Sequence, residues 1–163
     1  MMFSGCIISR TDQLSVAKPC LHDGDNLTCC MSASPDRDTV GALFLPTYTQ
    51  TGFPFSVALR LSDYVHGYSE IAVTGVDIEY GNNSVDHIEL NEIGLFTRNE
   101  VLNCGQADLS LNNVVRRRGT TAITLIGEFR TPDGNVESFR MRREVQLDSK
   151  TEFATWYDVI ASC

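Results

Sequence analysis

The six cysteines are the residues of this 163-residue chain whose chemistry can be inferred most directly from type and spacing. Four of them fall within the first 30 residues, and the even count permits complete pairing into disulfides. Disulfides persist in oxidising compartments, so the sequence favours an extracytoplasmic location (secreted, cell-surface or virion), with a cytoplasmic location as the alternative. We predict a clamp between Cys104 and Cys163, with the other cysteines fastening the N-terminal segment. The disulfide candidates are Cys6, Cys20, Cys29, Cys30, Cys104 and Cys163.

Cysteines and aspartates near the N-terminus also raise the question of a metal ion. Cys20-Leu21-His22 together with Cys29-Cys30 could ligate zinc, but their spacing matches no C-x-x-C arrangement. The tetrapeptide Asp23-Gly24-Asp25-Asn26 is similar to the opening of a calcium-binding loop, yet the later ligands of such a loop are missing. The sequence therefore predicts no metal site and no cofactor, and a calcium-binding module remains an alternative.

A further use of cysteine is the attachment of a lipid. The tetrapeptide Phe3-Ser4-Gly5-Cys6 resembles the end of a bacterial lipoprotein signal, in which small residues precede a cysteine that becomes lipidated. The apolar helix that belongs in front of such a motif is missing from the sequence. A bacterial envelope lipoprotein anchored through Cys6 is therefore kept as an alternative.

Histidines and nucleophile motifs give no support for catalysis. The chain has three histidines, His22, His66 and His87, and none lies at motif spacing from a nucleophile or a metal ligand. No P-loop, G-x-S-x-G elbow or H-E-x-x-H motif occurs in the sequence. We therefore predict that the protein is not an enzyme.

One loop combines polar and aromatic side chains in a way that suits ligand contact. Within Asp63–Tyr68, the candidate ligand residues are Tyr64, His66 and Tyr68. Tyrosine-rich loops at the end of a β-sandwich often contact sugars or proteins. A carbohydrate-binding module is therefore an alternative function, and packing of the loop against its own domain is the simpler interpretation.

Charge is unevenly distributed along the chain. Residues 111–150 carry eight basic and five acidic residues, a net charge of +3, although the whole chain carries −8. An acidic body with one basic sector disfavours nucleic-acid binding and suits head-to-tail contact between copies, or docking on an anionic surface. The alternative is that the arginines form cross-strand ion pairs with Glu128, Glu137 and Glu144. The predicted basic interaction patch comprises Arg116, Arg117, Arg118, Arg140, Arg142 and Arg143.

The clearest structural element is a β-hairpin over residues 121–147. Its turn, Thr131-Pro132-Asp133-Gly134-Asn135, places proline where φ near −65° starts a turn and glycine where a left-handed residue closes it. Apolar residues alternate along both flanking runs, and Arg143 interrupts the apolar face of the second. The basic sector is therefore expected to lie largely on strands.

Other runs also alternate with a period of two. Phe55, Val57, Leu59 and Leu61 predict a strand. In residues 71–80 the apolar phase slips at Thr74-Gly75, which predicts a β-bulge, and a second irregularity is expected near Asn91. For residues 152–163, apolar side chains on both faces favour a strand over a short helix.

These patterns predict an all-β fold: a single antiparallel β-sandwich of immunoglobulin-like or jelly-roll type over residues 40–163. Residues 1–39 have few periodic apolar positions and are predicted to form an irregular, cysteine-rich N-terminal arm. No apolar run is long enough to span a membrane as a helix. We expect a non-catalytic structural or adhesive subunit that acts by protein–protein contact, with other subunits or with copies of itself, in a surface assembly, filament or virion.

Overall fold

The computed structural model describes residues 6–23, 26–42 and 47–155, which form ten β-strands and no helix. The described residues thus include no helix that is long and apolar enough to cross a membrane. The predicted all-β fold class is confirmed. The strands are β1 (Cys6–Val16), β2 (Cys20–Asp23), β3 (Leu27–Ala42), β4 (Thr47–Asp63), β5 (Glu70–Tyr80), β6 (Val85–Leu95), β7 (Thr97–Asn99), β8 (Cys104–Val115), β9 (Thr120–Arg130) and β10 (Val136–Thr155).

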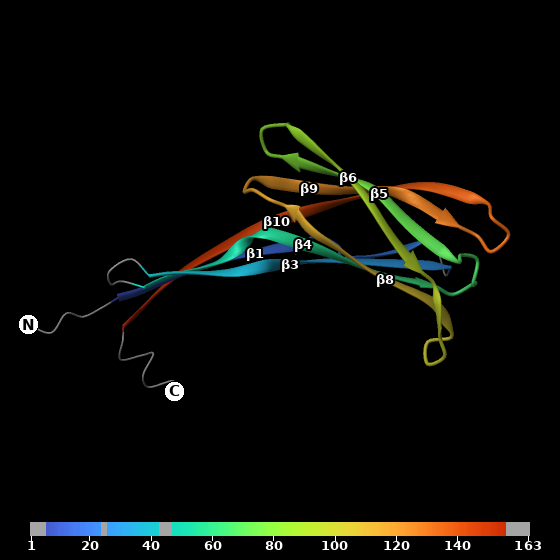
Figure 1. The fold of residues 1–163 in the computed structure, drawn as a ribbon, viewed down its shortest axis with the longest axis horizontal. Coiled ribbons are helices and arrows are strands. Elements are labelled where there is room, and N and C mark those ends of the chain that lie inside the picture. Colours follow the sequence, from blue (N-terminus) through green and yellow to red (C-terminus); the bar gives the residue numbers. More distant parts are fainter. Residues whose placement is uncertain (1–5, 24–25, 43–46, 156–163) are drawn as a thin grey trace, which may run out of the picture.

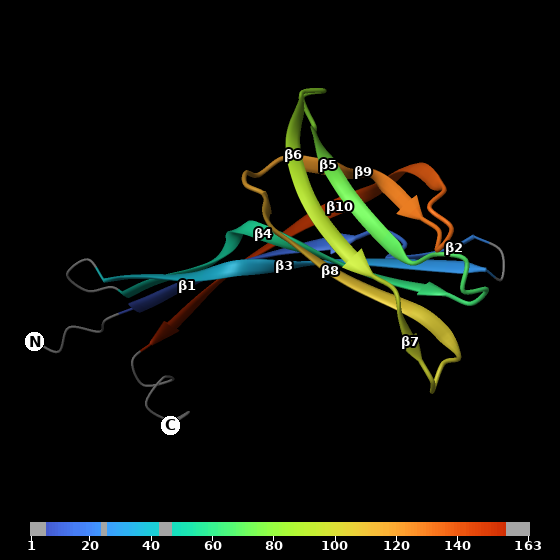
Figure 2. The ribbon, with the colours of Figure 1, turned by 45° about the vertical axis from the view of Figure 1, so that its right-hand side comes forward.

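The strands are arranged in two layers, as expected for a β-sandwich (Figures 1 and 2). One layer contains β2, β3, β4, β8 and β7, and the other contains β6, β5, β9 and the first half of β10. The 20-residue strand β10 passes between the layers, because residues 136–144 pair with β9 whereas residues 145–155 pair with β1. Strand β1 in turn pairs in parallel with β4, so it joins β10 to the first layer.

The core lies between the layers and follows the predicted alternation. Phe55, Val57, Leu59 and Leu61 are each at most 1% exposed, and the inward residues of β5 and β9 are buried against them. Because successive side chains of a strand point to opposite faces, the intervening residues of β4 face away from the core. The predicted strand over residues 55–61 is confirmed.

The predicted hairpin is also confirmed, as β9 and β10 joined by residues 131–135. The Thr131 N–H donates to the Asn135 carbonyl oxygen and the Gly134 N–H to the Thr131 carbonyl oxygen, both at 3.0 Å. Gly134 has a φ of 90°, the left-handed region that a residue without a Cβ enters at no steric cost. The turn chemistry therefore sets the register of the strands that carry most of the basic sector.

Both predicted irregularities occur, and they lie side by side. The β5–β9 and β5–β6 registers each shift between Val73 and Gly75. In β6, Leu90 and Asn91 together stand opposite Thr74, so β6 carries an extra residue at the same level. The bulge changes which side of β5 faces inward, and for this reason Val73 and Val76 are both fully buried.

The N-terminal residues differ from their prediction. Instead of an irregular arm, residues 6–42 contain β1, β2 and β3, paired with strands β10 and β4. Pro35 lies within β3 at a register shift, which an edge strand tolerates because its missing N–H is not needed by a second neighbour. The strand predicted over residues 152–163 is confirmed for 152–155, and residues 156–163 lie outside the described residues.

Candidate functional site

The cysteines are placed by the alternation of strand residues. Cys20 and Cys30 form a disulfide between β2 and β3, so these two candidates are confirmed. Cys29 and Cys104 are free, buried thiols, so the predicted Cys104–Cys163 clamp and the pairing of Cys29 are wrong. Successive side chains of a strand point to opposite faces, so Cys29 faces the core and its neighbour Cys30 faces outward. Burial raises the pKa of the Cys29 thiol, and the nearby Arg143 guanidinium opposes that shift.

Two cysteine predictions stay untested. The side chain of Cys6 and the whole of Cys163 lie outside the described residues, so lipidation of Cys6 remains a prediction. The zinc alternative loses its ligands, because the disulfide occupies two of the thiols and the third points to the opposite face of β3.

The Tyr64–Tyr68 loop does not bring its three candidate residues together. Asp63 is buried, and its carboxylate accepts the N–H groups of Val65 at 3.2 Å and Tyr68 at 2.9 Å, which fixes the loop. Tyr68 stacks on Phe129 with ring centroids 4.7 Å apart, whereas Tyr64 and His66 are exposed. The loop therefore packs against its own domain through Tyr68, as the simpler interpretation has it.

The arginines of β10 do not form a free basic surface. Arg140 donates to Asp77 at 2.8 Å, and Arg142 makes two hydrogen bonds to Glu79, at 2.9 and 2.8 Å. The bond from Arg142 is the main reason that the pKa of Glu79 is lowered. These two acidic partners lie on β5, two strands away, and were not among those expected. Arg142 Nη1 also lies 3.5 Å from Oε1 of Glu144, which was expected, although this pair lies along one strand rather than across two. The arginines are therefore ion-paired, mainly with residues other than the predicted ones.

The other predicted basic residues are dispersed. Arg117 lies 4.2 Å above the centre of the Tyr80 ring and donates to Asp86 at 2.8 Å. Arg116 donates from Nε to the Asn113 carbonyl oxygen at 3.0 Å. Arg143 is buried in the core, where its Nη1 donates to the Arg142 carbonyl oxygen at 2.9 Å.

Arg118 makes a contact that no sequence pattern predicted. Its Nη2 donates to Asp12 Oδ2 at 2.5 Å, and Ser149 Oγ donates to Asp12 Oδ1 at 2.6 Å. Asp12 is fully buried, so the carboxylate joins β1, β10 and the β8–β9 loop from inside the fold. Asp12 stands in a polar run of the sequence, so no alternation of apolar and polar residues predicted that it is buried.

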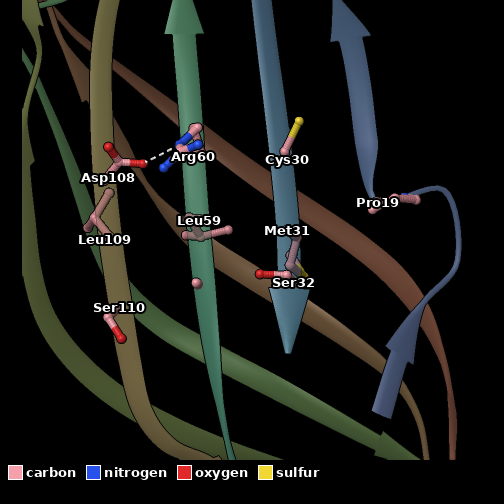
Figure 3. Close-up of a pocket in the computed structure, with 10 residues that line it drawn as sticks. Pro19, Cys30, Met31, Ser32, Leu59, Arg60, Asp108, Leu109 and Ser110 are labelled. Carbon is pink, nitrogen blue, oxygen red and sulfur yellow. Dashed lines mark hydrogen bonds and ion pairs between the residues drawn. The ribbon is translucent and has the colours of Figure 1, made fainter. Parts of the chain in front are cut away.

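A hollow of about 770 Å³ lies on the outer face of β3, β4 and β8 (Figure 3). Ser32, Ala58 and Ser110 stand in one register row there, and their small side chains leave the space. In the next row Arg60 Nε donates to Asp108 Oδ1 at 2.8 Å, with both side chains exposed. The charged groups of the hollow thus neutralise each other, and no nucleophile–base pair lines it.

Beyond the sandwich, four strands continue as a sheet that we call the extension, defined as residues 6–11 of β1, 38–42 of β3, 47–51 of β4 and 150–155 of β10 (Figures 1 and 2). In the described residues the extension is one layer thick. Within that same part of the chain, β3 beyond Met31 pairs only with β4, and β10 beyond Glu144 pairs only with β1. Both outer strands of the extension therefore present an unpaired backbone edge.

The unpaired edges, the hollow and the buried Asp12 contact are the features from which a function has to be inferred. No family model and no curated protein sequence matches this chain.

Proposed function

We propose that this chain is a non-catalytic structural or adhesive β-sandwich subunit that acts by protein–protein contact in a surface assembly, a filament or a virion. The observation that carries the proposal is the extension, in which two outer strands each leave one backbone edge unpaired over the described residues. An exposed row of N–H and C=O groups is a template on which a strand of another chain can add.

The length of the strands supports the same function. Strands β3, β4 and β10 have 16, 17 and 20 residues, well beyond the five or six that are usual in globular proteins. The excess builds the extension rather than enlarging the core (Figure 1). A protein that only needed a stable sandwich would gain little from such strands, whereas an assembly subunit gains a contact surface.

The Cys20–Cys30 disulfide supports an extracytoplasmic site of action, because disulfides persist where thiols are not kept reduced. Under the proposal, this bond fastens β2 to β3 on the surface of the assembled subunit. Anchoring through Cys6 would be an additional property of the same subunit.

The proposed function is tested by measuring self-association and partner binding of the full chain. Sedimentation velocity over a concentration series should show reversible association, because two unpaired edges favour strand addition. A chain that stays monomeric throughout, and that captures no protein from the surface fraction of its source, would contradict the proposal.

The hollow of Figure 3 favours a second candidate function, carbohydrate binding. Its hydroxyl groups and the exposed Arg60–Asp108 pair are groups that can hydrogen-bond to sugar hydroxyls. Glycan-array binding that is lost in Arg60→Ala and kept in Arg116→Ala would support this candidate. An array without any signal would remove it.

A further inference from the structure

The unpaired edge of β10 has a backbone polarity that can be assigned residue by residue. The Ala17 N–H donates to the Glu144 carbonyl oxygen at 2.8 Å, and this pair continues the β1–β10 register. In an antiparallel pair, the N–H and C=O groups of successive residues point alternately to the two sides of a strand. Even-numbered residues of β10 from Glu144 onward therefore bond to β1, and odd-numbered residues from Val145 onward present their groups on the opposite edge.

Over residues 136–144 of β10, this opposite edge is paired with β9. The β9–β10 register ends at Ala122 and Glu144, and in the part of the chain that the structure describes no other strand takes its place. The side chains of Asp148, Ser149 and Lys150 along this stretch are exposed. The edge is thus open to another strand.

We propose that a second copy of this chain adds its own β10 to this edge, antiparallel, with a two-fold axis at Ser149. The inference rests on the proposed function and names its partner. Ser149 stands opposite Ser149 of the second copy, and Leu147 stands opposite its Thr151, as hydrogen-bonded pairs. Asp148 then stands opposite Lys150 of the second copy, in a non-hydrogen-bonded pair, where Cα atoms are only about 4.5 Å apart. Symmetry repeats this opposite-charge pair on the other side of the axis.

Charge selects this register from its neighbours. Only odd-numbered residues present backbone groups on the free edge, so the allowed registers differ in steps of two. One step in one direction sets Asp148 against Asp148 of the second copy. One step in the other direction sets Lys150 against Lys150 of the second copy, and Asp148 against Glu152 of the second copy. Like charges directly opposite one another destabilise a sheet, so the two-fold axis at Ser149 is the favoured arrangement.

The second unpaired edge of the extension, that of β3, is less suited to symmetric pairing. On β3, Pro35 has no N–H to donate to a neighbouring strand. A two-fold axis at Arg37 would set Asp36 against Asp38 of the second copy. Self-pairing therefore favours β10 over β3.

The inference is tested by exchanging the two charges in the full chain. Asp148→Lys and Lys150→Asp each turn two attractive pairs into repulsive ones, so each should raise the dimer dissociation constant about tenfold at low salt. The double exchange restores opposite charges and should return the dissociation constant to within about twofold of the unmodified chain. Lys18→Asp, at an exposed lysine of the β1–β2 connection, makes the same charge change away from the edge and should have no effect.

A second variant tests the backbone contact. Thr151→Pro removes an N–H that points to the free edge and leaves the bonds to β1 in place, so it should abolish dimerisation without lowering the melting temperature. Association that persists unchanged in both single charge variants and in Thr151→Pro would overturn the inference while the proposed function stands. A chain that neither self-associates nor binds any protein would overturn both.

Discussion

The contact between Arg118 and Asp12 leads to a stability prediction whose size follows from burial. Asp12 is fully buried and holds two short contacts, to Arg118 at 2.5 Å and to Ser149 at 2.6 Å. Arg118→Ala leaves a buried carboxylate with its charge less well compensated, which costs about 3–5 kcal/mol when the site is dry. The Arg118 side chain is 41% exposed, so water can enter beside Asp12 when it is removed. The loss is therefore closer to one charged hydrogen bond, about 2 kcal/mol.

Urea unfolding measures this loss directly. With a slope of about 2 kcal/mol per molar urea, Arg118→Ala should lower the unfolding midpoint by about 1 M and leave the slope unchanged. The matched test uses Asp12→Asn, which keeps the shape of the side chain and removes its charge. In that background Arg118→Ala should cost less than about 0.5 kcal/mol, because no buried charge is left to compensate. An equal loss in both backgrounds would refute the reasoning.

Three further outcomes are expected. Gly127→Ala places a Cβ 2.2 Å from a backbone oxygen of β5 and should cost more than about 3 kcal/mol, whereas Gly81→Ala meets only ordinary contacts and should stay within about 0.5 kcal/mol by the same urea assay. The pKa of Glu79 is lowered in the fold, chiefly by Arg142, so this ion pair stabilises the protein above the unfolded pKa of about 4.3 and is lost as pH falls through the folded value. Arg142→Ala should therefore flatten the fall in melting temperature below about pH 4.5, and parallel curves would contradict this. Reduction of the β2–β3 disulfide, which closes a separation of 10 residues, should lower stability by about 2–3 kcal/mol in the chain-entropy model, and an unchanged midpoint in reductant would exclude that contribution.

Local signals predicted the central part of the fold, whereas its N-terminal part depends on contacts distant in sequence. The β9–β10 hairpin could be predicted because the turn at residues 131–135 and the alternation beside it are local. Strand β1 pairs Cys6 with Thr155 across almost the whole chain, and no local pattern encodes that pairing. The extension is one layer thick in the described residues, so its strands need no regular alternation of apolar and polar residues. This accounts for the part of the predicted irregular arm that lies in the extension, residues 6–11 and 38–39.

The predicted sites depended on contacts that residue type alone does not specify. Cys29 and Cys30 are adjacent and chemically alike, yet only the outward-facing Cys30 reaches Cys20. Tyr68 was placed in a binding loop, but its ring completes an aromatic cluster on Phe129. The unpaired edges were invisible for a different reason: an edge is defined by which strands are missing from its side, and the strand order could not be read from the sequence.

The bulge in β5 shows how one local irregularity controls the charge of a whole sheet face. Without the extra residue at Thr74, the side of β5 that buries Val73 would also turn Asp77 and Glu79 toward the core. The bulge turns Val76 and Ile78 inward instead, and so places both carboxylates on the outer face. Arg140 and Arg142 of β10 reach across β9 to these two carboxylates, and their charges are neutralised there. The basic sector therefore contributes to the stability of the second layer, and the part of β10 left for contact with another chain is the stretch beyond Glu144, where β9 has ended and opposite charges alternate along an open edge.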